Sequence, residues 1–600
     1  MYLKCNRRVK NGKEHRYWSI VENRRCGQRM AQRPVLYLGE INDSQREAWI
    51  EAIEAFDEAS GEQARLALFP ADRALPKAVE GTQNIAVRLR EFVLKRPRQW
   101  GACWLFTELW RELQLDDFWG EQLGRSREGT RWEAVLATLT AHRLIDPGSE
   151  WALHRHWFDH SAMADLLGGD ASLAADDTLY RCHDLLLEHK RALFGHLQNR
   201  WRDLFGAKFE VLLYDLTSTY FESDPSENPQ DKRGFGYSRD KRSDCVQVVI
   251  ALVMTPEGFP LAYEVLPGNT SDKSTLHDFL SKIETQYGKA DRIWVMDRGI
   301  PTEEVLAEMR ASDPPVYYLV GTPKTRLGQL EQELAQKPWE EARAGVEVKL
   351  LPQENELYVL AQSRDRMHKE RAMRQRQLKK LWARLKELRA MKNLKRDALL
   401  MKLGAAKNQG PAAWRLVDLK LPEPRQAVTP ETFRFRLRRD TLRETRRREG
   451  RYLLRSNLTG QDPAALWKFY LQLTQIEEAF KNLKGDLALR PIFHQREDRI
   501  EAHIFVAFLA YCLHVTLRQR LSAKAPGLTP RAVLEKFAAV QMLDAWFPTT
   551  DGRWLVFHRV TQPERDVQLL LAQLGLQLPP QSPPRITSNG QLDAPSLRPL

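Results

Sequence analysis

The segment from residue 470 to 484 carries acidic, phenolic and basic side chains at spacings that could support chemistry. It reads Tyr470-Leu-Gln-Leu-Thr-Gln-Ile-Glu477-Glu-Ala-Phe-Lys-Asn-Leu-Lys484. In a helix with about 100° per residue, Tyr470, Glu477 and Lys484 fall within roughly 60° of one another, and Lys481 joins them. The adjoining face is an apolar stripe: Ile476, Ala479, Phe480 and Leu483. The pattern predicts an amphipathic helix that presents a carboxylate beside a phenol and ammonium groups.

Two aspartates earlier in the chain stand where short apolar strands are expected to end. Asp215 follows the run Glu210-Val-Leu-Leu-Tyr, and Asp297 follows Arg292-Ile-Trp-Val-Met. Carboxylates at the ends of neighbouring strands converge at one edge of a sheet, and a divalent cation relieves their repulsion. Two such cations, roughly 3.5–4 Å apart, can activate a water or hydroxyl and stabilise the leaving oxygen in phosphoryl transfer. Taken alone, Asp215 could cap a strand end and Asp297 could pair with Arg298.

Taken together, these acids resemble a known catalytic set. The glutamate lies in a spaced pattern: Tyr470-x2-Leu473-x3-Glu477-x6-Lys484. With Asp215 and Asp297 before it, this pattern resembles the DDE transposases of bacterial insertion sequences, the group with the Y-(2)-R-(3)-E-(6)-K signature. Glu478 lies about 100° around the helix from Glu477, so geometry and spacing both favour Glu477 as the third acid.

The residues between the first two acids agree with the resemblance. They include Gly236-Tyr-Ser-Arg-Asp-Lys-Arg-Ser-Asp, a Val/Ile strand, and a block that ends in Pro267-Gly-Asn-Thr-Ser-Asp. The resemblance covers about residues 209 to 320 and 450 to 515. It implies that Asp215, Asp297 and Glu477 are catalytic and hold two Mg²⁺ ions, with Mn²⁺ able to substitute.

The chain departs from the signature at Leu473, where the family has arginine. Leu473 lies at the border of the apolar stripe, so we expect it to pack and not to bind phosphate. The resemblance then leaves Tyr470 and Lys484 as DNA contacts, with Lys481 and Arg490 as local candidates to supply the missing charge. The alternative for Lys484 is an ion pair with a surface carboxylate.

The expected fold is an α/β ribonuclease-H-like catalytic core with a large mixed insertion before the third acid, a helical N-terminal region and a small basic β module. We expect core strands at 210–216, 245–254, 259–266, 292–297 and 315–321, with helices at 274–286 and 302–311. The insertion is expected to hold a hairpin, at 346–351 and 357–361, and one long helix at 364–402. That helix is rich in lysine and arginine, so it could bind DNA by releasing counterions from phosphates, or it could be a solvated charged helix.

We expect six regions along the chain. They are a small basic β module (1–45), a helical, DNA-end-binding region (46–205), the first part of the core (206–322), the insertion (323–460), the second part of the core with the Glu477 helix and C-terminal helices (461–575), and a disordered tail (576–600). A helix is expected from 47 to 56. The helical region could instead be a scaffold.

Composition narrows the class of protein. The net charge of +13 and pI near 9.3 indicate a polyanionic partner, and nucleic acid fits better than a membrane. The opening residues hold no secretory signal, and the apolar stretch at 504–515 is shorter than the ~20 residues of a membrane span. The six cysteines are scattered singly, which argues against a disulfide framework or a cysteine zinc site. Three C-terminal histidines are expected to be structural and not metal ligands: His494, His503 and His514.

The predicted function is metal-dependent cleavage at the ends of an insertion sequence, followed by transfer of the freed strand into target DNA. The expected partners are double-stranded DNA, as element ends and target, and a second copy of the chain in a homodimer on DNA. The expected location is the bacterial cytoplasm, at the nucleoid, with no membrane contact. Two alternatives remain: a metal-dependent DNA nuclease that cuts without joining, and a catalytically silent DNA-binding protein.

Overall fold

The computed structural model describes most of the chain and divides it into two compact units. The described residues are 2–10, 13–26, 29–40, 45, 87–124, 126, 128–222, 224–225, 228, 231–238, 240, 242–270, 281–283, 285, 292–297, 300–322, 330, 333–334, 336–343, 345–353, 355–424, 426–460, 462–490 and 492–587. The first unit comprises Met1–Asn6, Arg16–Trp294 and Gln472–Leu600, and the second comprises Arg7–His15 and Val295–Leu471. The expected helices at 47–56 and, for the most part, 274–286 lie outside the described residues.

The strands that carry the first candidate acid form an antiparallel meander in the first unit. They are β5 (Val211–Phe221), β6 (Val246–Met254) and β7 (Pro260–Pro267), in the order β5-β6-β7. All nine residues of β6 are buried, as expected for its continuous apolar sequence. On the other side of β5 lies β8 (Ile293–Met296), whose Ile293 amide donates to the Glu210 carbonyl at 2.8 Å.

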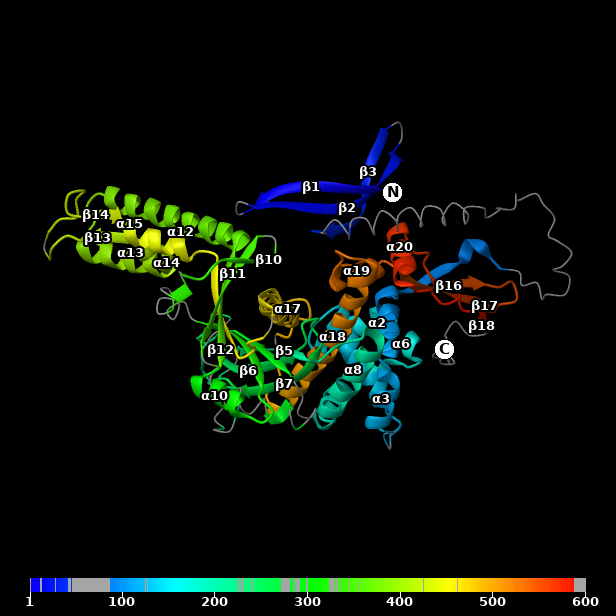
Figure 1. Cartoon of the computed structure of the whole chain (residues 1–600). Coiled ribbons are helices and arrows are strands. Elements are labelled where there is room, and N and C mark those ends of the chain that lie inside the picture. The colour runs from blue at the N-terminus through cyan, green and yellow to red at the C-terminus, as the bar shows by residue number, and fades with distance from the viewer. Residues whose placement is uncertain are drawn as a thin grey trace. The chain divides into compact units, whose positions relative to one another are not determined.

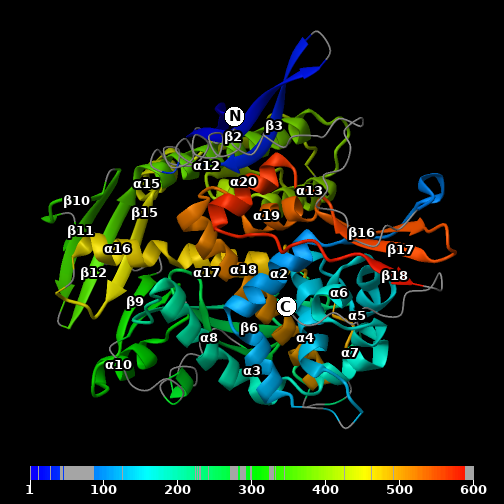
Figure 2. The ribbon, with the colours of Figure 1, turned by 90° about the vertical axis from the view of Figure 1, so that its right-hand side faces the viewer.

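Helices of the first unit surround one long core helix, α18 (Glu497–Lys524), as Figure 2 shows. The N-terminal helical region supplies α2 (Gly101–Glu112), α3 (Leu115–Gln122), α4 (Trp132–Ile145), α5 (Glu150–Ala152), π-helix η3 (Leu153–Trp157), η4 (Phe158–His160), α6 (Met163–Leu167), η5 (Ala171–Ala174), α7 (Asp176–His183), η6 (Leu187–His189) and α8 (Lys190–Phe205). Helix α18 packs against α2, α4, α7 and α8. It has the length and apolar composition of a membrane span, but 94% of its most apolar window is buried, as in a core helix.

A second sheet of the first unit was not expected from the sequence. It has the order β18-β17-β16-β4 and joins the C-terminal strands to β4 (Val93–Gln99). Those strands are β16 (Gln541–Pro548), β17 (Trp554–Val560) and β18 (Arg585–Thr587). Strand β18 lies inside the segment 576–600 that was expected to be disordered, and it pairs with Trp554–Val556. Residues 588–600 lie outside the described part of the chain.

Buried ion pairs hold this sheet to α6. Arg98 of β4 lies 3.0 Å from Asp544 of β16 and 2.8 Å from Asp165 of α6. His558 of β17 contacts the same Asp544 carboxylate at 2.7 Å. The guanidinium of Arg98 is 1% exposed and the carboxylate of Asp544 is fully buried, so each requires the other as a partner. Helix η2 (Leu89–Glu91) contacts β16 of this sheet, whereas α19 (Pro530–Phe537) and α20 (Arg565–Leu574) pack against α18 and against each other.

The N-terminal module is a three-stranded sheet in the order β1-β2-β3 (Figure 1). Its strands are β1 (Tyr2–Lys10), β2 (Lys13–Cys26) and β3 (Arg29–Gly39), and β2 pairs antiparallel with β3. Ile20, Leu36 and Leu38 are buried, which gives the small sheet one apolar face.

The second unit contains a further run of strands and the basic insertion. The strands of this unit that come after β8 in the chain lie in the sheet in the order β9-β15-β12-β11-β10. Their bounds are β9 (Tyr317–Thr322), β10 (Glu340–Arg343), β11 (Val346–Gln353), β12 (Glu356–Ser363) and β15 (Arg451–Ser456), and α10 (Glu303–Ala311) precedes β9. The hairpin of β11 and β12 lies where the sequence predicts it.

The long basic helix predicted at 364–402 is two helices, α12 (Arg364–Ala390) and α13 (Arg396–Gln409). The chain turns between them through Asn393, whose φ of 58° lies in the left-handed region that asparagine tolerates. The turn lets Leu399 and Leu403 pack against Leu385 and its neighbours on α12. Burial of this apolar face therefore overrides the continuous helical propensity of the sequence. The unit is completed by α14 (Pro411–Trp414), β13 (Val417–Lys420), β14 (Arg434–Leu437), α15 (Arg439–Arg448) and α16 (Pro463–Leu471).

Candidate active site

Asp215 lies in the middle of a long strand and not at its end. It is the fifth residue of the eleven in β5, it is half-buried, and it lies opposite Leu252 of β6. The sequence predicts that the strand ends at 216, because polar residues follow. In the structure, the polar residues Thr217 to Thr219 are buried and paired with β6, so the strand continues to Phe221. The carboxylate accepts a hydrogen bond from the Leu216 amide at 2.8 Å.

Glu477 is exposed on α17 (Leu473–Lys484), a helix that packs against β5 in the first unit. The apolar stripe predicted for this helix is buried: Ile476, Ala479, Phe480 and Leu483. Leu473 is buried too, which confirms that the residue in the signature's arginine position packs. The stripe therefore anchors the helix and leaves Glu477 and Glu478 at its surface.

The predicted single helix over 470–484 is interrupted. Tyr470 belongs to α16, α17 begins at Leu473, and the Gln475 amide bonds to Gln472 at 2.8 Å in a tighter turn. In the second unit the Tyr470 ring lies 5.8 Å from Tyr452 and 6.1 Å from Trp467, centre to centre. Tyr470 therefore takes part in an aromatic cluster. That Tyr470 and Glu477 face the same way stays a prediction.

Asp297 is the residue that follows β8, as the sequence predicts, and it is exposed. It belongs to the second unit, whereas Asp215 and Glu477 belong to the first. The structure thus packs the strand that carries Asp215 against the helix that carries Glu477. The approach of Asp297 to the other two stays a prediction.

Lys484 and Arg490 converge on one carboxylate that the sequence analysis did not single out. The Lys484 ammonium lies 3.1 Å from both oxygens of Asp240, and Arg490 lies 3.5 Å from one of them. The Arg490 guanidinium also lies 4.3 Å from the centre of the Tyr220 ring, and Arg242 lies 4.7 Å from it. Tyr220 belongs to β5, so this cationic group is built at the end of the strand that carries Asp215.

Asp240 is shared by two cations, Lys484 and Arg490. Ion pairs of this kind hold long side chains in one orientation. Lys481, the other predicted contact, is exposed on α17. Asp240 lies in the quoted Gly236-Tyr-Ser-Arg-Asp block, but nothing in its spacing connects it with a lysine 244 residues later.

A second polar cluster lies buried in the first unit, and no sequence signal pointed to it. One oxygen of Glu150, Oε1, lies 3.1 Å from Nε2 of His183, 3.3 Å from Nε2 of His494 and 3.0 Å from Nδ1 of His503. Burial and the nearby Arg143 charge lower the pKa of His503 to about 4, and burial lowers the pKa of His183. Both imidazoles are therefore neutral at neutral pH.

Asp215 on a strand and Glu477 on a helix packed against that strand are two carboxylates of the kind that can hold a divalent cation. Residues 206–513, just over half of the chain, match the family described as Transposase DDE domain. Residues 3–65 match the family described as IS1634 family transposase, N-terminal domain. The chain therefore belongs to the DDE transposases of insertion sequences, and it is an enzyme that cleaves and transfers DNA. Enzymes with this domain use divalent metal ions.

Comparison with curated proteins finds no match. Among solved structures, one similar chain comes from the "Cryo-EM structure of piggyBac transposase synaptic complex with hairpin DNA (SNHP)". It is 8% identical, with a TM-score of 0.32, and the alignment covers 73% of this chain and 78% of that one.

Proposed function

We propose that Asp215, Asp297 and Glu477 are the catalytic acids of this transposase and hold two Mg²⁺ ions. The observation that carries the proposal is the packing of α17, with its exposed Glu477, against β5, with its half-buried Asp215. Carboxylate oxygens are the ligands that Mg²⁺ prefers, and neither side chain is fully buried. Mn²⁺ has similar preferences and is expected to substitute.

The proposed scaffold is a ribonuclease-H-like core. Its support is the succession of three antiparallel strands, β5 to β7, followed by β8, α10 and β9 along the chain. This is the element order that the ribonuclease-H-like hypothesis requires. The insertion between β9 and α17 then separates the third acid from the first two in sequence.

The proposed reaction is hydrolysis at the 3′ end of the element, followed by attack of the freed 3′ hydroxyl on a target phosphodiester. When bound, the ions supply an acidified water or hydroxyl and a counter-charge for the leaving oxygen. The residues of the chain position the reactants. The three acids fix the ions, the buried stripe of α17 fixes Glu477, and the reaction needs no covalent protein intermediate.

The proposed phosphate-binding groups are Lys484 and Arg490, with Lys481 and Tyr470 as further DNA contacts. Asp240 holds Lys484 and Arg490 in place through the 3.1 Å and 3.5 Å contacts. A guanidinium and an ammonium held side by side can bind one phosphodiester through charge-assisted hydrogen bonds. Their place at the end of β5 would put that phosphate near the strand of Asp215.

We also propose that α12 binds the DNA backbone. Lys369, Arg376 and Lys380 are exposed and lie within about 40° of one another around the helix. The buried leucines of α12 lie on a different face: Leu381, Leu385 and Leu388. A cationic row opposite a packed face gains affinity from counterion release without reading sequence.

Transposition needs two element ends in one complex, so we propose a homodimer on DNA, acting at the bacterial nucleoid. Light scattering of the complex with end-sequence duplexes tests this stoichiometry. The six regions expected from the sequence stay a proposal, with 46–205 as the region that recognises the element ends.

The decisive experiment incubates full-length protein with a labelled duplex that carries the ends flanking its own gene, a target plasmid and Mg²⁺. Wild type is compared with Asp297→Ala. Joined products that disappear in the variant support transposition at the proposed site. Cleavage without joining would favour a nuclease, and binding without metal-dependent cleavage in either protein would favour a silent DNA-binding protein.

A further inference from the structure

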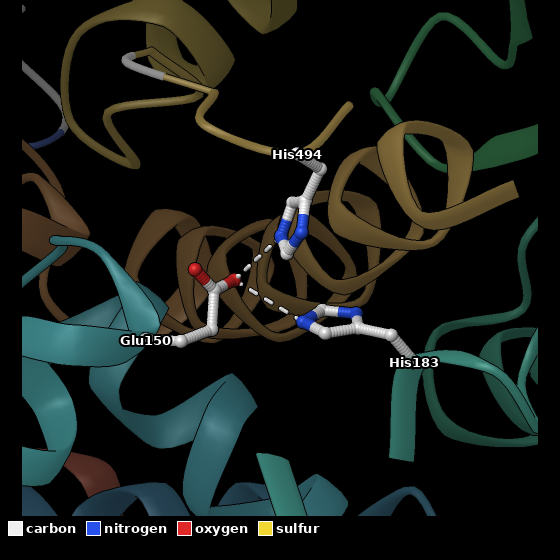
Figure 3. Close-up of side chains that lie close together, drawn as sticks. All are labelled: Glu150, His183 and His494. Atoms are coloured by element: carbon white, nitrogen blue, oxygen red, sulfur yellow. Dashed lines mark hydrogen bonds and ion pairs between the residues drawn. The ribbon is translucent and has the colours of Figure 1, made fainter. Parts of the chain in front are cut away.

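Three buried side chains from separate segments of the first unit converge on one point, as Figure 3 shows. Glu150 is the first residue of α5, His183 is the last residue of α7, and His494 lies in the segment between α17 and α18. One ligand atom from each lies within 4.8 Å of the other two. The exposed fractions of these residues are 5%, 1% and 7%, so bulk water does not separate them.

Two of the three distances between these donor atoms match the edges of a tetrahedron around zinc. Zinc binds histidine nitrogen and carboxylate oxygen at about 2.0–2.2 Å, which puts neighbouring donor atoms roughly 3.3–3.5 Å apart. Oxygen Oε1 of Glu150 lies 3.1 Å from Nε2 of His183 and 3.3 Å from Nε2 of His494. The two imidazole centres are 5.2 Å apart, close to the ~5 Å of two rings bound to one tetrahedral ion. We propose that Glu150, His183 and His494 bind a zinc ion.

The chemistry of the set distinguishes it from the catalytic acids. Imidazole nitrogens select a borderline transition ion, whereas Mg²⁺ takes oxygen ligands. Two histidines and a glutamate are also a ligand set that zinc uses, with water as the fourth ligand. The site therefore takes an ion of a different class from the ions at Asp215, Asp297 and Glu477.

Zinc binding would change the protonation of His183. Without an ion, Nε2 of His183 lies 3.1 Å from Oε1 of Glu150 and donates to this carboxylate in its protonated form. Zinc needs Nε2 without its proton, which moves the proton to Nδ1. Within the described residues, Nδ1 of His183 is buried and has no hydrogen-bond partner, so its proton would need a water molecule as acceptor.

A second layer of contacts orients the carboxylate. Arg143 lies 3.3 Å from Nε2 of His503, and because arginine only donates, this nitrogen must be bare. The His503 proton is then on Nδ1, which donates to Glu150 at 3.0 Å. Nε2 of His503 also lies 3.3 Å from the Leu489 carbonyl oxygen. In this tautomer the nitrogen has no proton, so the two atoms form no hydrogen bond. A metal-binding carboxylate that accepts a further hydrogen bond is typical of zinc sites.

The ion would tie the segment after α17 to the N-terminal helices. His494 stands four residues beyond Arg490, and its partners Glu150 and His183 belong to α5 and α7. Arg143 also donates to the Ala488 carbonyl at 2.8 Å, which fixes the same segment from a second side. Zinc at this point would limit the motion of the chain that carries Arg490, so the role is structural and separate from phosphoryl transfer.

The test measures metal content in the full-length protein. Protein stripped with EDTA is loaded with Zn²⁺, dialysed and analysed by mass spectrometry of the metal, and a second sample is loaded with Co²⁺. The proposal expects one retained zinc per chain, the intense visible absorption of tetrahedral cobalt, and a rise in Tm of several degrees with zinc. Loss of zinc on dialysis, together with absence of the cobalt absorption, would overturn it.

Variants separate this site from the catalytic one. Glu150→Gln keeps the size and a carbonyl acceptor but loses the charge, and His494→Ala removes a ligand, so both are expected to lose the zinc. His503→Ala removes only the orienting contact and is expected to weaken zinc binding by about 10- to 100-fold. The exposed His156→Ala and the catalytic Asp215→Ala are expected to keep full zinc content. Equal zinc content in wild type and in folded Glu150→Gln, checked by circular dichroism, would also overturn the proposal.

Discussion

The ammonium of Lys484 lies 3.1 Å from both carboxylate oxygens of Asp240, although 244 residues separate them in sequence. Their side chains are 16% and 19% exposed, so the pair is shielded from water but within reach of a ligand. We propose that a lysine held in this way keeps a fixed position beside β5 and exchanges part of its contact with Asp240 for a DNA phosphate.

Replacement of Lys484 by alanine should weaken DNA binding by one phosphate contact. The plot of log affinity against log salt is expected to lose about 0.9 units of slope, because one fewer counterion is released. Fluorescence anisotropy with end-sequence duplexes at several salt concentrations measures the slope. Lys208→Ala, at an exposed position before β5, serves as the control and should leave the slope unchanged.

Glu477→Gln should abolish cleavage and joining while DNA affinity stays close to wild type. An amide cannot supply the negative charge that a divalent ion needs, and we expect a loss of about 10³-fold or more in rate. The matched control is Glu478→Gln, an exposed glutamate about 100° further around the same helix, for which we expect a change of less than about threefold. Equal losses in the two variants would place the third acid elsewhere.

Removal of divalent metal should stop both chemical steps and leave binding intact. In EDTA, we expect duplex binding without cut or joined products, and addition of Mg²⁺ or Mn²⁺ should restore both. Gel analysis of the labelled duplex follows the two steps in one experiment. If Ca²⁺ restored cleavage and joining at the rate seen with Mg²⁺, that result would argue against a site built for a small ion such as Mg²⁺.

The exposed row on α12 should contribute to affinity and not to sequence choice. Replacement of Lys369, Arg376 and Lys380 together by glutamine is expected to reduce the salt slope by up to about 2.7 units, for three lost phosphate contacts. Affinity for end-sequence and random duplexes should fall by the same factor. A fall for the end sequence alone would show that the helix reads bases.

Asp544→Ala should destabilise the first unit strongly. It leaves the Arg98 guanidinium, 1% exposed, without one of its two carboxylates, and such losses cost about 3–5 kcal/mol. Differential scanning calorimetry should show a lower Tm for one transition. The control is Asp551→Ala, which breaks an exposed pair with Arg553 and should leave the Tm close to that of the wild type.

Local patterns predicted several elements close to their observed bounds. The strand expected at 245–254 is Val246–Met254, and the helix expected at 302–311 is Glu303–Ala311. In both cases the side-chain pattern of the segment reflects its own burial. The stripe of α17 was predicted for the same reason, because residues three and four apart share a helix face whatever the rest of the chain does.

Patterns failed where a distant segment decided the outcome. Strand β5 passes beyond residue 216 because β6 pairs with its polar residues, and the basic helix breaks at Asn393 because α13 folds back on α12. Strand β16 was missed, and one of its two partners, β4, lies more than 400 residues earlier. Strand β17, which pairs with β16 and β18, was missed with it.

The sequence by itself determined the class of the enzyme, the identity of the three candidate acids and the basic character of the insertion. These depend on residue types in order along the chain, and they are visible without a fold. Only the tertiary structure decided the pairing of Lys484 with Asp240 and the gathering of Glu150, His183 and His494. Contacts between residues hundreds of positions apart arise from how helices and strands pack, and a single sequence carries no periodic signal for them.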